Sequence, residues 1–173
     1  MRRGEILALR WSDVSGDLSV AHVRRTLQPT ETGLVFERPK THRSARSVML
    51  PAFLGPYLLR QRADQARRRQ KLGGDGWSDH DLVVDDGDGT PFNPGTLSAG
   101  WARFLRKAGL PWVRFHDLRH AHATLMLLQG VHPKVVSERL GHASVGITLD
   151  TYSHVLPVMQ EEAARAFDDL FAG

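Results

Sequence analysis

The chain has no cysteine among its 173 residues, which excludes disulfide bonds and cysteine-ligated metal sites. It also lacks any apolar run long enough to span a membrane, and its first residues do not resemble a secretory signal peptide. Internal repeats and low-complexity tracts are absent as well. The lack of cysteine fits a reducing compartment, and we therefore expect a cytoplasmic location.

The composition is typical of a globular domain, with 41% hydrophobic and 24% charged residues. The length suits one domain with a sizeable core and is short for two. A formal net charge of +4 and a pI near 10.0 favour an anionic partner.

The hydrophobic pattern predicts an α+β fold, mainly α-helical, with a small antiparallel β-sheet near the N-terminus. Turn residues separate the strands, and glycine or proline ends most of the helices. The predicted helices cover residues 2–14, 51–72, 96–107, 116–129, 133–140, 144–155 and 158–171, and the predicted strands cover 18–24, 34–37, 47–50 and 82–84.

Four polar side chains in the C-terminal third carry the strongest functional signal. His116 and Arg119 lie three residues apart near a helix start, so they share a face where free amides favour an anion such as phosphate. His142 follows a helix-ending glycine, and Tyr152 is one of two tyrosines in the chain. Each residue alone has a structural explanation, such as a helix cap, a surface ion pair or a half-buried core position. Their joint order instead suggests phosphodiester chemistry without a metal.

Two basic residues nearer the N-terminus complete the candidate set. Arg2 has a carboxylate, Glu5, three residues later, which could hold its guanidinium in place. Lys40 lies in a polar turn between predicted strands, where a flexible lysine could reach a leaving group. Both residues could equally be parts of solvated surface segments.

These motifs resemble those of the tyrosine recombinases, the phage integrase and site-specific recombinase family, over essentially the whole chain. Residues 2–14 (RRGEILALRWSDV) resemble the first arginine box, and Lys40 matches the lysine of the hairpin turn. Residues 116–120 (HDLRH) resemble the second box, and residues 140–142 (LGH) and Tyr152 resemble the remainder. Lys40 is the least distinctive match, because Arg43 and Arg46 lie nearby.

The resemblance implies a mechanism and assigns roles. Tyr152 would attack the scissile DNA phosphate and form a 3′-phosphotyrosyl link. Lys40 would protonate the leaving 5′-hydroxyl, and His116 would assist proton transfer from the phenol. The non-bridging oxygens would be stabilised by pre-placed donors, with no metal and no other cofactor, and Glu5 would support the first of them. These donors are Arg2, Arg119 and His142.

The resemblance also implies double-stranded DNA as partner, self-association on DNA as a tetramer, and a bacterial or phage-encoded protein. Phosphate contacts are expected from Arg43 and from the basic helix 51–72, although a solvated charged face explains that helix equally well. The candidates on the helix are Arg60, Arg67 and Arg68. For the final helix, 158–171, we expect packing on its own domain, although in relatives such a segment can dock onto a neighbouring protomer.

The family usually carries an N-terminal DNA-clamping domain and further helices before the first arginine box. We therefore expect residues 1–173 to be a single catalytic domain of an N-terminally truncated chain without its core DNA-binding domain, and to bind DNA weakly alone.

Three alternatives stay open. A truncated, non-catalytic DNA-binding remnant and a type IB topoisomerase-like relaxing enzyme share the fold or the tyrosine chemistry. A zinc hydrolase would use the clustered histidines His116, His120 and His122.

Overall fold

The computed structural model describes residues 1–38, 45–153 and 156–171, and it shows the expected mixture of helices and a few antiparallel strands. Seven α-helices are present in these residues, together with two short 3-10 helices, Trp11–Asp13 and Ala52–Leu54. The α-helices are α1 (Arg3–Leu7), α2 (Gly55–Leu72), α3 (Pro94–Lys107), α4 (Asp117–Leu128), α5 (Pro133–Leu140), α6 (Val145–Thr151) and α7 (Leu156–Phe171).

The strands form two separate antiparallel pairs within the described residues. Strand β1 (Val20–Val23) pairs with β4 (Arg46–Met49), and β2 (Thr26–Thr30) forms a hairpin with β3 (Gly33–Glu37). The sequence pattern missed β2, in which Pro29 and three exposed positions hide the alternation of an edge strand. The segment around Leu82, predicted as a strand, forms a single bridge with Arg10 instead.

The predicted helix over residues 2–14 is wrong. Helix α1 ends at Leu7, and the chain then becomes extended to bond with a distant segment. The amide of Trp11 donates to the carbonyl of Asp81 at 2.8 Å, and the amide of Val83 donates to the carbonyl of Leu9 at 2.9 Å. A tertiary pairing therefore replaces the last two turns that the local pattern suggested.

Most other helices are close to the prediction. Helix α5 has the predicted bounds, and α2 follows a 3-10 turn after Pro51. Helix α3 starts two residues early because the Asn93 side chain caps it, accepting from the amide of Gly95 at 2.7 Å. Helix α6 is shorter than the predicted 144–155, since it ends at Thr151.

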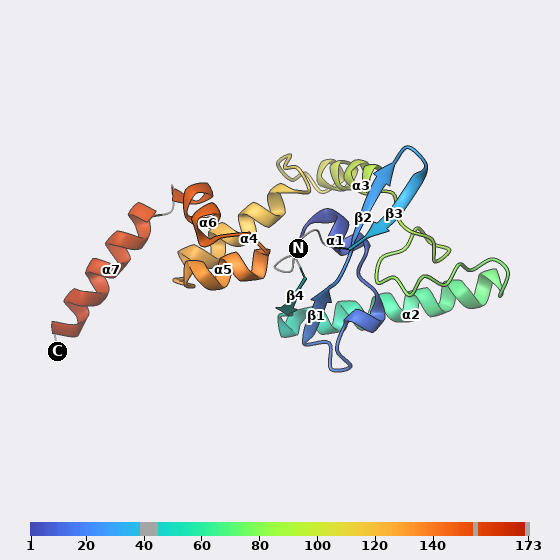
Figure 1. Ribbon diagram of the computed structural model, residues 1–173, viewed down its shortest axis with the longest axis horizontal. Helices are drawn as coiled ribbons and strands as arrows, with labels where there is room; N and C mark the ends of the chain where they lie inside the picture. Colours follow the sequence, from blue (N-terminus) through green and yellow to red (C-terminus); the bar gives the residue numbers. More distant parts are fainter. Residues whose placement is uncertain (39–44, 154–155, 172–173) are drawn as a thin grey trace.

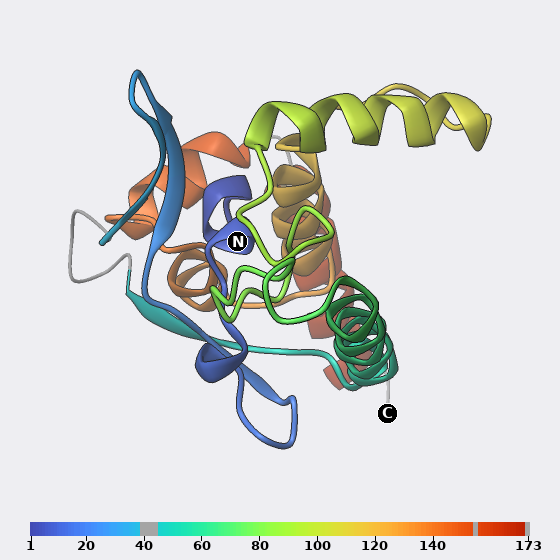
Figure 2. The ribbon, with the colours of Figure 1, turned by 90° about the vertical axis from the view of Figure 1, so that its right-hand side faces the viewer.

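The position of α1 decides where the site lies. Figures 1 and 2 show this short helix in the middle of the molecule, between the β2–β3 hairpin and the group α4–α6. It packs on β2 and α3, and a Cβ on Gly4 would lie 2.6 Å from the carbonyl oxygen of Leu27. Glycine at this position lets the helix approach the strand closely.

The core is divided between this centre and the C-terminal helices. One buried cluster joins α1 to β2 through Leu7, Ala8 and Leu27. A second joins α4, α5 and the end of α6, and it consists of Ala123, Leu127, Val136, Leu140 and Tyr152.

The expected packing of the last helix on its own domain is limited, among the described residues, to a contact with α4. Beyond this contact helix α7 extends away from the body (Figure 1). Its side chains Phe167, Leu170 and Phe171 are 66%, 75% and 79% exposed. Among the described residues, no helix is long and apolar enough to cross a membrane.

Candidate active site

Arg2 is fixed at the start of α1 by its own helix. Its backbone amide donates to Glu5 Oε2 at 2.7 Å, and its Nη1 donates to Glu5 Oε1 at 2.9 Å. Its Nη2 donates to the carbonyl of Gly141 at 3.3 Å, which links α1 to the end of α5. The Arg2 side chain is 44% exposed, so it is held in place and still accessible to a ligand.

Glu5 is buried between two arginines. Arg46, on β4 and 7% exposed, donates from Nη2 to Glu5 Oε2 at 2.8 Å and from Nη1 to Oε1 at 3.1 Å. Burial alone would raise the pKa of the Glu5 carboxyl, but hydrogen bonds from Arg46 and Arg2 outweigh it and lower the pKa to about 2. The carboxylate is therefore charged at neutral pH and compensates both guanidinium groups.

Arg119 lies on α4 with 8% of its surface exposed. Its Nη2 donates to the carbonyl of Leu140 at 2.6 Å. Its Nη1 is buried and meets no hydrogen-bond partner among the described residues. Burial lowers the pKa of Arg119 to about 10, helped by the positive charge of Arg2, yet the group stays charged at neutral pH. A buried cationic donor without a partner is costly, and an anion would satisfy it.

His142 follows the left-handed C-cap Gly141 of α5, where φ is +71°. Its Nδ1 lies 2.8 Å from Oγ1 of Thr148, which is fully buried on α6. Burial, together with the charges of Arg119 and Arg2, lowers the pKa of His142 to about 4, so the ring is neutral at pH 7. When the threonine hydroxyl donates to Nδ1, the proton of the ring resides on Nε2, which then acts as a donor.

Tyr152 ends helix α6 with its side chain 3% exposed. The phenol oxygen lies 2.9 Å from Nδ1 of His120 on α4. The ring of His120 in turn contacts that of His116 edge to face, with centroids 5.2 Å apart. Burial raises the pKa of the Tyr152 phenol, and nearby Arg119 opposes this only in part. The pKa of His116 is lowered by burial and by the neighbouring His120 and Arg119.

One cavity of about 460 Å³ gathers the cationic and imidazole groups from three parts of the chain. It is lined by residues at the N-terminal end of α1, at the start of α4, and in and after the α5–α6 connection. Its lining comprises Arg2, His116, Arg119, His120, Gly141, His142, Ala143, Ile147 and Thr151. Donors that converge from distant segments can bind the oxygens of one phosphate group.

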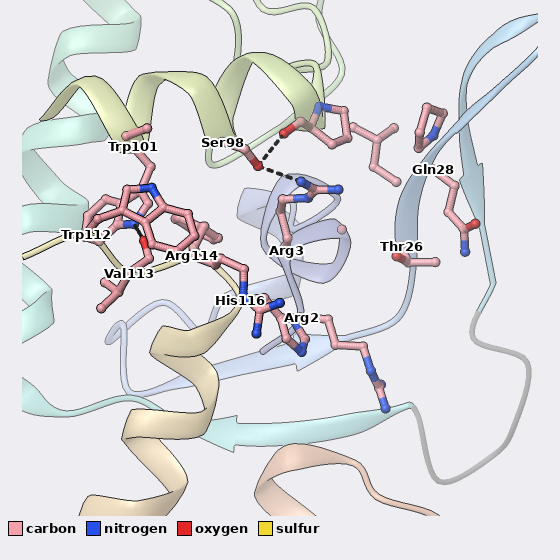
Figure 3. Close-up of a pocket in the computed structure, with 16 residues that line it drawn as sticks. Arg2, Arg3, Thr26, Gln28, Ser98, Trp101, Trp112, Val113, Arg114 and His116 are labelled. Carbon is pink, nitrogen blue, oxygen red and sulfur yellow. Dashed lines mark hydrogen bonds between the residues drawn. The ribbon is translucent and has the colours of Figure 1, made fainter. Parts of the chain in front are cut away.

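A second pocket of about 670 Å³ adjoins this cavity, since Arg2 and His116 line both. Figure 3 shows these two residues next to each other, with Trp101 and Trp112 further along the wall. The Nε1 of Trp101 donates to the carbonyl of Val113 at 2.9 Å, while Trp112 is 70% exposed. The pocket therefore extends the polar cavity with aromatic surface.

The predicted DNA-binding residues of α2 do not line this cavity. Lys40 and Arg43 lie outside the described residues. On α2, Arg60 is exposed, Arg67 pairs with Asp64, and Arg68 pairs at 3.0 Å with Asp85. Because the Asp85 side chain is 1% exposed, Arg68 has a structural partner inside the protein.

The clustered histidines that suggested zinc have separate partners. His120 faces Tyr152, whereas Nε2 of His122 accepts from Nε of Arg139 at 3.2 Å. In the described part of the chain, no group of three or more histidine or carboxylate side chains is arranged to hold a metal ion.

Three residues at this site were given no role in the recombinase site predicted from the sequence: Arg46, His120 and Thr148. His120 could have been found, because it lies four residues after His116 and so shares its helix face. Arg46 and Thr148 have no local signal, since their partners are 41 and six residues away and meet them through the tertiary fold.

Comparison with known proteins gives a consistent result. Residues 1–158 match the model of the phage integrase family. The chain is 34% identical over 170 residues to the ICEBs1 integrase of Bacillus subtilis, covering 98% of this chain and 46% of that protein. It is 32% identical over 182 residues to a "Tyrosine recombinase XerC-like" protein of Caldanaerobacter subterraneus subsp. tengcongensis, covering 99% and 46% respectively. The chain thus spans about half the length of these relatives.

Solved structures agree on the fold. The Tn1549 transposon integrase in complex with transposon right end DNA superposes with a TM-score of 0.78 at 20% identity. That alignment covers 95% of this chain and 54% of the integrase chain. The XerA recombinase gives a TM-score of 0.65 at 25% identity, covering 94% and 53%.

Proposed function

The chain belongs to the phage integrase family, and from that premise we propose that it forms the catalytic domain of a site-specific DNA recombinase. The domain cleaves and rejoins DNA through a 3′-phosphotyrosyl intermediate on Tyr152. The observation that carries this proposal is the buried Nη1 of Arg119, which has no hydrogen-bond partner in the described part of the chain and belongs to a residue that shares a cavity with Arg2 and His142. This cavity offers positive charge and pre-placed donors to a phosphodiester. The buried phenol of Tyr152 does not line the cavity itself but contacts His120, which does.

The proposed roles follow from the local chemistry. Arg2, Arg119 and His142 bind the non-bridging oxygens and stabilise the charge that develops in the pentavalent transition state. With the Thr148 hydroxyl donating to Nδ1, the neutral ring of His142 carries its proton on Nε2 and donates from there. Glu5 supports Arg2, to which it bonds directly. Neither a metal nor another cofactor is required in this proposal.

Two proton-transfer roles remain proposals from the family motifs. Lys40, as an ammonium on a flexible stem, protonates the leaving 5′-oxygen better than a guanidinium, which does not release its proton. His116 assists proton transfer from the phenol, and it lies at the mouth of the cavity beside His120.

Double-stranded DNA is the proposed partner. Similar solved structures include the Tn1549 transposon integrase in complex with transposon right end DNA and the XerH recombinase bound to its difH substrate. Phosphates beyond the scissile one are contacted by exposed arginines, with Arg60 the freest of the α2 candidates since Arg67 and Arg68 pair with carboxylates. Arg43 is a further candidate. Such contacts position the DNA but do not specify its sequence.

Self-association on DNA is also proposed, as a tetramer. Helix α7 extends from the body and exposes Phe167, Leu170 and Phe171, which a neighbouring protomer can cover. Similar proteins come from bacteria and phages, and we infer that this protein is bacterial or phage-encoded and acts on cytoplasmic DNA.

The decisive test is a covalent-trapping assay on nicked duplexes from the DNA flanking the gene. A nick beside the scissile phosphate lets the cleaved end diffuse away, so a protein–DNA adduct accumulates. The adduct is expected from the unaltered chain and from Tyr57→Phe, which changes the other tyrosine, and it is expected to vanish in Tyr152→Phe. DNA binding without an adduct would favour a non-catalytic remnant. Relaxation of supercoiled DNA without strand exchange would favour the topoisomerase-like alternative.

A further inference from the structure

The buried phenol of Tyr152 has a defined polar partner. Its ring packs in the cluster with Ala123, Leu127, Val136 and Leu140, and its hydroxyl lies 2.9 Å from Nδ1 of His120. Buried hydroxyl groups require hydrogen-bond partners, so this contact helps to fix the orientation of the phenol.

His120 connects that phenol to the phosphate-binding cavity. It is half-buried on α4, directly after Arg119, and it lines the cavity together with Arg2 and His142. Its ring contacts the ring of exposed His116 edge to face, one helical turn earlier. His120 is therefore the imidazole in contact with the reacting oxygen, and His116 is an exposed imidazole in contact with His120.

The reaction requires a base at this place. The phenol oxygen must lose its proton as it bonds to phosphorus, and burial makes Tyr152 harder to ionise than a free tyrosine. A neutral imidazole with its proton on Nε2 presents a bare Nδ1 to the phenol, as the observed contact permits. Histidine is the side chain best suited to exchange protons near neutral pH.

We propose that His120 is the catalytic base that takes the phenolic proton of Tyr152 during strand cleavage and returns it during rejoining. This proposal rests on the recombinase function proposed above. The O–H bond of the phenol breaks and its proton moves to Nδ1. The oxygen forms a bond to phosphorus, the bond from phosphorus to the 5′-oxygen breaks, and Lys40 supplies the proton to that leaving oxygen. The negative phosphate offsets the imidazolium charge that forms beside Arg119.

The test separates proton transfer from positioning. His120→Asn keeps an acceptor near the place of Nδ1 but provides no base. In the trapping assay it is expected to lower the rate of adduct formation by about 10²-fold or more, as for loss of a general base. His122→Asn is the matched control on the same helix, because His122 contacts Arg139 outside the cavity, and its rate is expected to be unchanged.

Replacing Tyr152 with a fluorinated tyrosine distinguishes proton transfer from a purely structural role of His120. The fluorinated phenol ionises at lower pH, so the loss caused by His120→Asn is expected to shrink by at least tenfold. An equal loss with both tyrosines would overturn the proposal, and so would an unchanged rate in His120→Asn. An absence of adduct from the unaltered chain would overturn the recombinase function and this role together.

The contact itself is measured without DNA. In Tyr57→Phe, Tyr152 is the one remaining tyrosine, so a 13Cζ-tyrosine label gives a single NMR signal. Removing the imidazole in His120→Ala is expected to shift that signal, and His122→Ala is expected to leave it in place. An unchanged chemical shift in His120→Ala would overturn the inference, even if the recombinase function is confirmed.

Discussion

Replacing Glu5 with glutamine tests how much the Glu5 charge stabilises the folded protein, because the substitution removes the charge and nearly preserves the shape of the side chain. Glu5 is 5% exposed and bonds both to Arg46, itself 7% exposed, and to Arg2. The substitution removes the carboxylate that pairs with the buried Arg46 guanidinium. Removing one partner of a buried ion pair is strongly destabilising.

The size of the effect follows from the pKa of Glu5. A fall from 4.5 to about 2 corresponds to about 3 kcal/mol of folding free energy, at about 1.36 kcal/mol per pKa unit. Because the folded-state pKa lies below the unfolded one, this stability is present above about pH 4.5 and is lost as the pH falls toward 2. The difference between the parent chain and Glu5→Gln is therefore about 3 kcal/mol at pH 7 and roughly half of that near pH 3.

Urea unfolding of both chains at pH 7, 4.5 and 3 measures this difference. The matched control is Glu138→Gln, which removes the same group from an exposed ion pair with Lys134, where the side chains are 65% and 59% exposed. Its cost is expected to be no more than about 0.5 kcal/mol. A cost for Glu5→Gln as small as that of the control, or one that does not change with pH, would refute the reasoning.

Two further predictions concern the connection from α5 to α6. Gly141→Ala is expected to destabilise the chain by more than Gly130→Ala, as measured by urea unfolding, although φ is similar at +71° and +72°. Both alanines carry left-handed strain of about 1–2 kcal/mol, but a Cβ at 141 also lies 2.8 Å from Nη1 of the anchored Arg46, whereas position 130 is open. Thr148→Val removes the hydroxyl that holds Nδ1 of His142 and is expected to slow adduct formation about tenfold or more, as loss of a supporting hydrogen bond does elsewhere. An unchanged rate would show that the hydroxyl does not orient the ring.

The helices that were predicted well carry their own boundary signals. Helix α5 has Pro133 at its first position and Gly141 after its last, and both bounds were predicted. Helix α2 ends before Gly73 as expected. In these segments local chemistry and tertiary packing agree, so a pattern in the sequence is sufficient.

The predictions from the sequence were wrong where contacts with distant segments outweigh the local hydrophobic pattern. Residues 2–14 have helical periodicity, yet the backbone at Leu9 and Trp11 bonds to the segment 81–83. Helix α7 has an apolar side that suggested packing on its own domain, yet Phe167 and Leu170 are exposed. Periodicity predicts that a face is apolar but does not identify the surface that covers it.

The residues that line the cavity were more predictable from the sequence than the residues that hold them in place. The motif order predicted Arg2, Arg119 and His142 as site residues, and the fold brings these three residues to one cavity; their roles stay a prediction. The groups that hold them, such as Arg46, meet them only through long-range contacts and leave no periodic signal.

The residues that hold the arginines in place explain why the cavity favours an anion. Arg2 and Arg46 share the single carboxylate of Glu5, and their positive charges lower the pKa of Arg119. Positive charge thus exceeds negative charge around the cavity, and Nη1 of Arg119 is left with an unsatisfied donor in the described structure. In the proposed function a phosphodiester would relieve both costs at once, and binding and transition-state stabilisation would depend on the same groups. The ionised carboxylate of Glu5 offsets part of the repulsion among these arginines in the folded domain. We therefore expect this one buried carboxylate to affect both the stability of the site and, in the proposed function, its binding of phosphate.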